Sequence, residues 1–235
     1  YFCTTDFLLN TMNFHIITLL PYAFDSYINE SIVARAVKER KIKIKFYNPR
    51  DFTKDPERKS KIFHGAGKHN RRVDKSPYGG GPGMVIEALP VLKAVEKAVG
   101  KKKKVKIIFL APNGKQFDNT YAKKLSKTYK DIVIIAGRYE GVDARVRKIL
   151  KAEVVTVGPY VLTGGELPAM IILDAVARQI KGVLGNKDSI EEGRTASKDV
   201  YTRPEVLEYK DKKHRVPKVL LSGHHEKINK WREKK

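Results

Sequence analysis

The chain has 235 residues, enough for one large domain or for a domain of ordinary size with a small second one. Lys and Arg number 48 against 26 Asp and Glu, so the formal charge is +22, which favours a polyanionic partner, nucleic acid first. A single cysteine, Cys3, excludes a disulfide framework and a thiolate metal cluster, and no apolar run reaches the roughly 18 residues of a membrane-spanning helix.

This composition predicts a cytoplasmic protein in a reducing compartment with no membrane contact. The alternative explanation of the many lysines is a surface rich in ion pairs, as proteins of thermophiles have. That pattern raises Glu together with Lys, whereas here the acids lag behind the bases.

The first fifty residues predict a strand, a helix and a strand. Residues 1–11 differ in character from the rest, so we expect an upstream extension with Met12 as the natural start. The apolar run from Met12 to Pro21 predicts a buried strand, and apolar residues at helical spacing predict a helix over 24–39. Alternation of Ile and Phe with lysines over 42–46 predicts a half-exposed strand.

Residues 50–77 form a long polar, basic segment. Between Lys38 and Lys75 there are fourteen Lys and Arg against five Asp and Glu. Such a segment is either a surface insertion or an RNA-contacting loop that orders on binding, and we favour the second. The glycine cluster at 78–84 lacks the Gly-Lys-Ser/Thr of a phosphate loop, which argues against an NTPase.

The next hundred residues alternate helices with buried strands. Apolar spacing predicts helices over 86–99 and 121–129, and runs rich in Val and Ile predict strands over Val105–Leu110, Ile132–Ala136 and Glu153–Val157. Strands without a polar face are typical of a parallel sheet covered on both sides. We therefore predict an α/β fold with a parallel sheet and helices on both faces.

Two of these strands lead into glycine-rich turns. Gly-Arg-Tyr-Glu-Gly follows one strand at 137–141, and Gly-Pro-Tyr-Val-Leu-Thr-Gly-Gly-Glu follows the next at 158–166. Any one of these glycines is explained as turn punctuation. Because ligands bind beyond the carboxyl ends of parallel strands, the density of glycine there predicts a ligand site.

The helix predicted over Pro168–Ile180 is apolar almost all round, which indicates burial on every side, and a subunit interface is a natural place for it. Beyond it we predict a linker over 186–200 and a small basic domain over 201–235, after an α/β domain over 12–185. The last domain has ten Lys and Arg against three acids from Lys210 onward.

Seven motifs occur in one order along the chain: PRDFT (49–53), PYGGGPGM (77–84), GRYEG (137–141), VGPYVLTGGELPAM (157–170), GVLG (182–185), YTRPEVLE (201–208) and VLLSGHH (219–225). In this order they closely resemble the bacterial tRNA (guanine-N1)-methyltransferase family, TrmD. The resemblance implies a SPOUT-class α/β domain with a trefoil knot, a small mainly helical C-terminal domain and a homodimer.

The resemblance also implies a reaction. The family methylates N1 of guanosine 37 in tRNA with S-adenosylmethionine, so we expect tRNA and not DNA as the partner, with Mg²⁺ left open as a second cofactor. By motif match, three loops hold S-adenosylmethionine, and their expected residues are Phe109, Leu110, Ala111, Pro112, Gly137, Tyr139, Glu140, Gly141, Val157, Gly158, Pro159, Tyr160, Val161, Leu162, Gly164, Gly165 and Pro168. No resident metal site is expected.

Guanine N1 carries a proton, so methyl transfer there needs a general base and a group that stabilises charge on O6. The family uses an Asp in the linker and an Arg at the end of the buried helix, and the Arg matches Arg178. The linker here is shorter than the family's: Asp188 is the Asp-Ser match, Glu192 lies nearer the expected spacing, and Glu191 and Asp199 are weaker candidates.

Two departures concern the cofactor and tRNA contacts: Pro159 stands where the family commonly has Asp, and the C-terminal extension is short. Two other functions stay open on the sequence, a related knotted methyltransferase acting on another RNA and an RNA-binding protein that has lost catalysis.

Overall fold

The fold is given by a computed structural model, which describes residues 11–53, 71–184 and 199–233. The chain divides into two units, Tyr1–Leu184 and Gly185–Lys235. The expected extension over 1–11, most of the basic segment and most of the expected linker lie outside the described residues.

Five parallel strands form the sheet of the first unit. In chain order they are β1 (Met12–Ile17), β2 (Ile42–Tyr47), β5 (Val105–Gln116), β6 (Asp131–Ile135) and β7 (Glu153–Thr156), and their order across the sheet is β2-β1-β6-β5-β7. All five residues of β6 are buried, as its unbroken Val/Ile run requires in the middle of a sheet. The predicted parallel sheet is confirmed.

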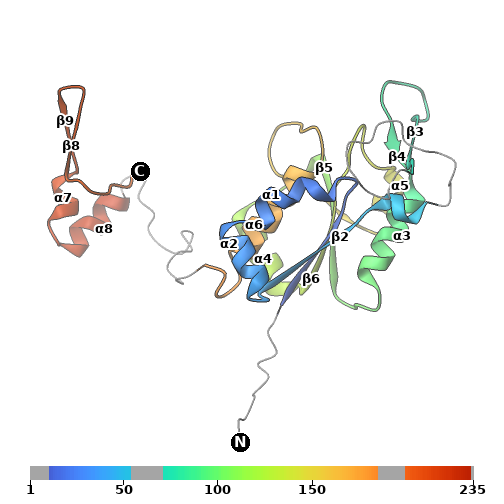
Figure 1. The fold of residues 1–235 in the computed structure, drawn as a ribbon, viewed down its shortest axis with the longest axis horizontal. Helices are drawn as coiled ribbons and strands as arrows, with labels where there is room; N and C mark the ends of the chain where they lie inside the picture. Colours follow the sequence, from blue (N-terminus) through green and yellow to red (C-terminus); the bar gives the residue numbers. More distant parts are fainter. Residues whose placement is uncertain (1–10, 54–70, 185–198, 234–235) are drawn as a thin grey trace, which may run out of the picture. The chain divides into compact units, whose positions relative to one another are not determined.

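Helices cover both faces of this sheet (Figure 1). One layer holds η1 (Pro21–Phe24), α1 (Asp25–Ile28), α2 (Ser31–Lys38), α4 (Asn119–Thr128) and α6 (Glu166–Ala177), and the other holds α3 (Ala88–Val99) and α5 (Ala144–Ile149).

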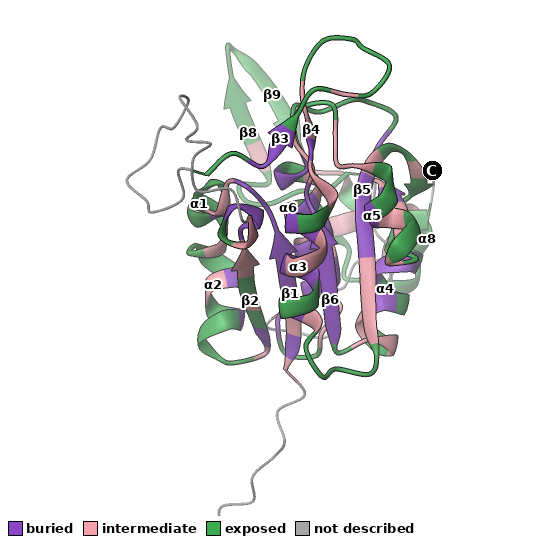
Figure 2. Ribbon diagram, turned by 90° about the vertical axis from the view of Figure 1, so that its right-hand side faces the viewer, coloured by how far each residue is buried: buried purple, intermediate pink, exposed green. Residues whose placement is uncertain are grey.

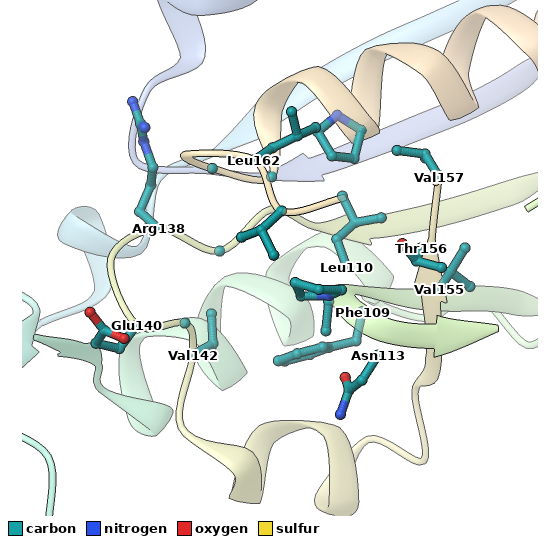
Figure 3. A pocket seen from close by; sticks show the side chains of 18 of the residues that line it. Phe109, Leu110, Asn113, Arg138, Glu140, Val142, Val155, Thr156, Val157 and Leu162 are labelled. Carbon is teal, nitrogen blue, oxygen red and sulfur yellow. The ribbon is translucent and has the colours of Figure 1, made fainter. Parts of the chain in front are cut away.

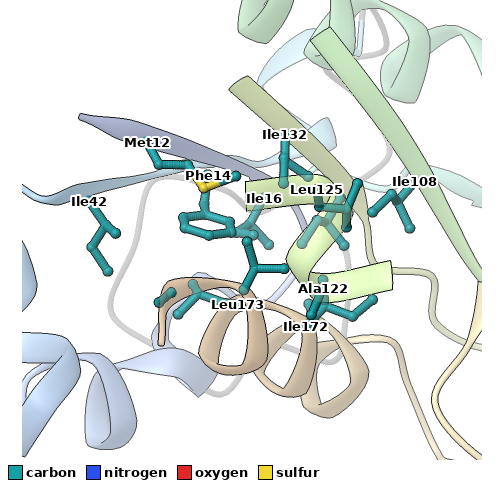
Figure 4. Close-up of a cluster of buried hydrophobic side chains, with 14 of the residues drawn as sticks. Met12, Phe14, Ile16, Ile42, Ile108, Ala122, Leu125, Ile132, Ile172 and Leu173 are labelled. Atoms are coloured by element: carbon teal, nitrogen blue, oxygen red, sulfur yellow. The ribbon is translucent and has the colours of Figure 1, made fainter. Parts of the chain in front are cut away.

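The sheet residues alternate between two hydrophobic cores, as a period of two dictates. Phe14 and Ile16 of β1 pack with α4 and α6, where Leu125, Ile172 and Leu173 are fully buried (Figure 4). Ile17, the next residue of β1, packs with the α3 layer instead. The prediction of helices on both faces is confirmed.

Two local expectations were wrong, and one short helix was not predicted. The helix predicted over 24–39 is divided at Asn29–Glu30, and Ser31 has a φ of 51°, a left-handed value that a continuous helix cannot contain. The strand predicted to stop at Leu110 continues to Gln116, with a shift in its pairing to β7 between Leu110 and Lys115. The short α5 was not predicted, because only Val146 among its residues is buried.

Short elements join the main ones. After β2 comes η2 (Pro49–Phe52), and a two-stranded antiparallel ribbon of β3 (Asp74–Lys75) and β4 (Val85–Ile86) follows. No helix in the described part of the chain is both long and apolar enough to cross a membrane.

The second unit begins with a hairpin that the sequence analysis missed. Strands β8 (Val206–Tyr209) and β9 (Lys212–Arg215) pair in antiparallel fashion around Lys210 and Asp211, whose φ values of 50° and 60° suit a tight hairpin turn. Two helices follow, α7 (Lys218–Leu221) and α8 (His225–Glu233), the second of which matches the predicted terminal helix. No residue of these four elements is buried (Figure 2), so the unit presents its basic side chains to solvent.

Candidate functional site

A cavity of about 550 Å³ lies at the carboxyl edge of the sheet, where β5, β6 and β7 end (Figure 3). Its size is within the usual range for sites that bind small molecules and cofactors. The second half of β5 and the loops after β6 and β7 form its walls, and the lining residues are Phe109 to Asn113, Gly137 to Val142, Ala144, Arg147, Val155 to Val157, Tyr160 to Gly165 and Pro168. The cavity is therefore at the edge where the sequence predicted a ligand site.

The loop after β6 is held by the glycine cluster at 78–84. Glu140 donates its backbone N–H to the carbonyl of Met84 at 3.0 Å, and Ile86 donates its N–H to the carbonyl of Gly141 at 2.9 Å. Gly83 has a φ of +81°, and a Cβ there would lie 2.6 Å from the Glu140 Cγ. The cluster that lacked a phosphate-loop signature thus supports the wall of this cavity.

The loop after β7 is bonded to the loop after β6. Gly165 donates its N–H to the carbonyl of Gly137 at 2.8 Å, and Arg138 forms an isolated antiparallel bridge with Gly164. The Arg138 Nη1 also donates to the carbonyl of Thr163 at 3.1 Å. These contacts join two walls of the cavity at one point.

A buried carboxylate lies behind that point. Glu166, the first residue of α6, is 5% exposed. Its Oε1 accepts a hydrogen bond of 2.9 Å from the hydroxyl of Thr18, and its Oε2 lies 3.4 Å from the Arg138 Nε. Glu166 was not among the predicted site residues, although it is the acid that directly follows Gly164 and Gly165.

The structure brings together every expected cofactor residue except Gly158 and Pro159. Gly158 is buried beneath the ring of Tyr160, and its carbonyl accepts a hydrogen bond of 2.9 Å from the Thr156 hydroxyl. Pro159 is exposed. Eight further residues line the cavity that the sequence did not predict. They lie between the expected cofactor residues or a few positions beyond them: Asn113, Arg138, Val142, Ala144, Arg147, Val155, Thr156 and Thr163.

The lining combines apolar side chains with a few charges. Phe109 and Leu110 face the cavity from β5, while Arg138 and Glu140 point in different directions from their shared loop (Figure 3). Just outside, Asp143 caps the N-terminus of α5, and its hydrogen bonds from Arg145 lower the pKa of that carboxyl. The cavity thus offers backbone amides, the guanidinium groups of Arg138 and Arg147, and apolar walls. Such a lining suits an organic ligand that carries both polar and apolar parts.

Arg178 does not line this cavity. It caps the C-terminus of α6, and the ten positions that separate it from Pro168 span about 15 Å at the rise of an α-helix. In the described part of the chain, its side chain has no ion pair.

Asp188, Glu191 and Glu192 lie outside the described residues, and Asp199 is exposed. No cluster of three His, Cys, Asp or Glu that could hold a metal occurs within residues 11–53, 71–184 and 199–233.

The family model described as tRNA (guanine-1)-methyltransferase TrmD matches residues 12–235. This chain belongs to that family. A tRNA (guanine-N(1)-)-methyltransferase of Psychromonas ingrahamii is 44% identical over 227 residues, covering 93% of this chain and 84% of the relative. One of Pseudoalteromonas atlantica is 43% identical, covering 94% and 78%.

The crystal structure of the tRNA (m1G37) methyltransferase from Aquifex aeolicus superposes with a TM-score of 0.73 at 33% identity, covering 95% of this chain and 88% of that one. These matches confirm the family expected from the motifs and the SPOUT type of α/β fold. The trefoil knot expected of the family stays a prediction.

Proposed function

We propose that this protein is the tRNA (guanine37-N1)-methyltransferase of its cell, which transfers the methyl group of S-adenosylmethionine to N1 of guanosine 37. The observation that carries the proposal is the coincidence of motif and geometry. The segments with the GRYEG and VGPYVLTGGELPAM motifs line one cavity, and the family model extends over residues 12–235.

The residues of the cavity fit S-adenosylmethionine. Its adenine and ribose need hydrogen-bond partners, which the backbone of the Gly137–Gly141 and Gly164–Gly165 turns provides, and apolar walls, which Leu110, Leu162 and Pro168 provide. When bound, this cofactor supplies an electrophilic methyl group. The fixed loops then orient it and exclude water from the transfer.

The protein must also remove the N1 proton and stabilise charge on O6. We assign the first task to a linker carboxylate, Asp188 or Glu192, and the second to Arg178. Arg178 lies about 15 Å along α6 from Pro168 and does not line its own cavity, so we assign it to the active site of a second copy of the chain. This argues for a homodimer in which one subunit holds the cofactor and the other supplies Arg178.

The cation excess supports tRNA as the substrate, because phosphates provide most of the affinity in such complexes. A cytoplasmic location follows from the substrate. Mg²⁺ stays open, and methylation rates over a titration with EDTA and MgCl₂ test it.

A methylation assay with tRNA transcripts tests the proposal. Transcripts with G at position 37 should accept one methyl group per tRNA, identified as N1-methylguanosine after nuclease digestion, and transcripts with A37 should accept none. Methylation of another nucleotide would identify a related methyltransferase, and cofactor binding without transfer would identify an RNA-binding protein.

A further inference from the structure

We propose that Glu166 is a positioning residue which, with Thr18 and Arg138, sets the affinity of the cavity for the cofactor by holding two of its walls together. The proposal rests on the proposed function for the identity of that cofactor. Glu166 itself does not line the cavity, whereas Arg138 and the neighbouring Thr163, Gly164 and Gly165 do.

The hydrogen-bond directions around Glu166 are determined by its neighbours. The Thr18 hydroxyl oxygen accepts an N–H from Leu20 at 3.0 Å, so its own hydrogen is directed to the Glu166 Oε1 at 2.9 Å. The second oxygen faces the Arg138 Nε at 3.4 Å. Both oxygens thus serve as acceptors, and one carboxylate links the end of β1 to the loop after β6.

Neither Gly164 nor Gly165 leaves room for a side chain. A Cβ on Gly164 would lie 2.6 Å from both the Arg138 Cδ and the Glu166 Oε2, and a Cβ on Gly165 would lie 2.6 Å from the Ala136 Cα. At Gly165 the backbones of the two segments therefore approach each other as closely as glycine allows. A loss of the carboxylate contacts displaces cavity walls, because interiors this tightly packed transmit small shifts.

A buried carboxylate can also be only a stabilising element of the fold, and Glu153 offers the matched control. It too accepts a hydrogen bond from a hydroxyl, that of Tyr121 at 2.7 Å, and pairs with a cation, Lys106. Burial opposes its ionisation, but the contacts with Lys106 and Tyr121 outweigh burial and lower its pKa. Glu153 is the first residue of β7 and does not line the cavity.

The test compares Glu166→Gln with Glu153→Gln in the full-length protein. An amide cannot accept from both Thr18 and Arg138, because one of its two atoms is a donor. Calorimetric titration with S-adenosylmethionine should give a Kd raised about tenfold or more in Glu166→Gln, and methylation at saturating cofactor should keep kcat within about twofold. Glu153→Gln should bind the cofactor like the parent, even if its Tm falls.

Two further measurements keep the outcome decisive. Thr18→Val should raise the Kd in the same direction, and Thr18→Ser should restore it, which covers the case in which Glu166→Gln does not fold. In cofactor-free protein, the Gly165 amide should exchange its hydrogen faster in Glu166→Gln than in the parent, because its bond to Gly137 loosens.

Parental Kd values in both Glu166→Gln and Thr18→Val would overturn the proposal, as would an equal loss of affinity in Glu153→Gln. Failure of the parent protein itself to bind S-adenosylmethionine would count against the proposed function instead. The exchange of the Gly165 amide would still decide whether Glu166 joins the two loops.

Discussion

At the scale of single residues, a titratable group is buried on the face of the sheet that α3 covers. His15 is 2% exposed; its Nε2 lies 2.9 Å from the Asp131 Oδ1, and its Nδ1 lies 3.2 Å from the Tyr47 hydroxyl. Burial lowers the pKa of His15 below 6.5, and repulsion from Lys102 and Lys45 adds to this, although Asp131 acts in the opposite direction. The imidazole is therefore neutral when the protein is folded at neutral pH.

This burial predicts a loss of stability in mild acid. Below about pH 6.5 the unfolded chain binds a proton at His15 that the folded chain does not, so the free energy of unfolding falls as the pH decreases, by at most about 1.4 kcal/mol per pH unit. Urea denaturation between pH 7.5 and 5 measures the slope. His15→Gln should flatten it, and the exposed control His214→Gln should leave it unchanged. An equal slope in His15→Gln and the parent would contradict the assignment.

The proton at guanine N1 gives a second prediction at this scale. Replacing the true base by its amide keeps the size of the side chain but removes the proton acceptor, so methyl transfer should fall by about 10²-fold or more while cofactor binding persists. Single-turnover assays of Asp188→Asn and Glu192→Gln with saturating tRNA identify the base, and we favour Asp188. Near-parental rates in both variants would move the role to Asp199 or to a water-mediated route.

Arg178→Ala should lose turnover to a similar extent, because the charge that develops on guanine O6 loses its partner. Mixing Arg178→Ala protein with a base variant provides a sharper test of the two-subunit site. If Arg178 and the base of each active site come from different chains, mixed dimers hold one site without either substitution and regain part of the activity. Absence of any recovery after subunit exchange would place both groups on one chain.

At the scale of elements, helix α6 lines the cavity with Pro168 and also carries apolar side chains that are exposed in the single chain. Its buried side, including Ile172, packs on the sheet, yet Leu167 and Ile171 on its other side are 56% and 43% exposed in the single chain. A helix with apolar residues on both sides needs a second cover. We expect that cover to be the same helix of another copy.

Ile171→Glu should therefore weaken the dimer. Sedimentation velocity at low micromolar concentration should show a dimer for the parent and a smaller or unfolded species for Ile171→Glu, since a charge would be buried without a partner. Leu89→Glu serves as the control, because Leu89 is 55% exposed on α3, in the opposite layer. A folded parent monomer at this concentration would contradict the prediction.

The sequence predicted those strands and helices whose buried residues form a regular apolar pattern along the chain. The mainly apolar, buried runs of β1 and β6 admit one interpretation, and so do the helices α3 and α4 with apolar residues at regular spacing. The break before Ser31, the hairpin of β8 and β9 and the contacts of Glu166 were not predicted. They depend on a left-handed φ, a turn without glycine and a partner 148 positions away, none of which leaves a local pattern.

At the scale of the whole molecule, the net charge of +22 favours the binding of a polyanionic substrate such as tRNA. Among the described basic residues near the cluster at 78–84, Arg71 is exposed and Arg72 pairs with Asp74 at 3.2 Å while 44% of its side chain stays exposed. In both units, most other cations are exposed as well. Such charges contribute by releasing counterions from RNA, so the affinity should depend steeply on salt.

This gives the last prediction. In filter-binding or fluorescence assays over about 50–200 mM salt, the double variant Arg71→Ala/Arg72→Ala should bind tRNA more weakly, and its slope of log K against log salt should be shallower by about 1 to 2. Its Kd for S-adenosylmethionine should equal that of the parent, because neither residue lines the cavity. The control removes the same charge on α4, with Lys123→Ala/Lys124→Ala. If both doubles change the slope equally, tRNA senses only the net charge; if neither does, the basic segment before β3 takes no part in binding.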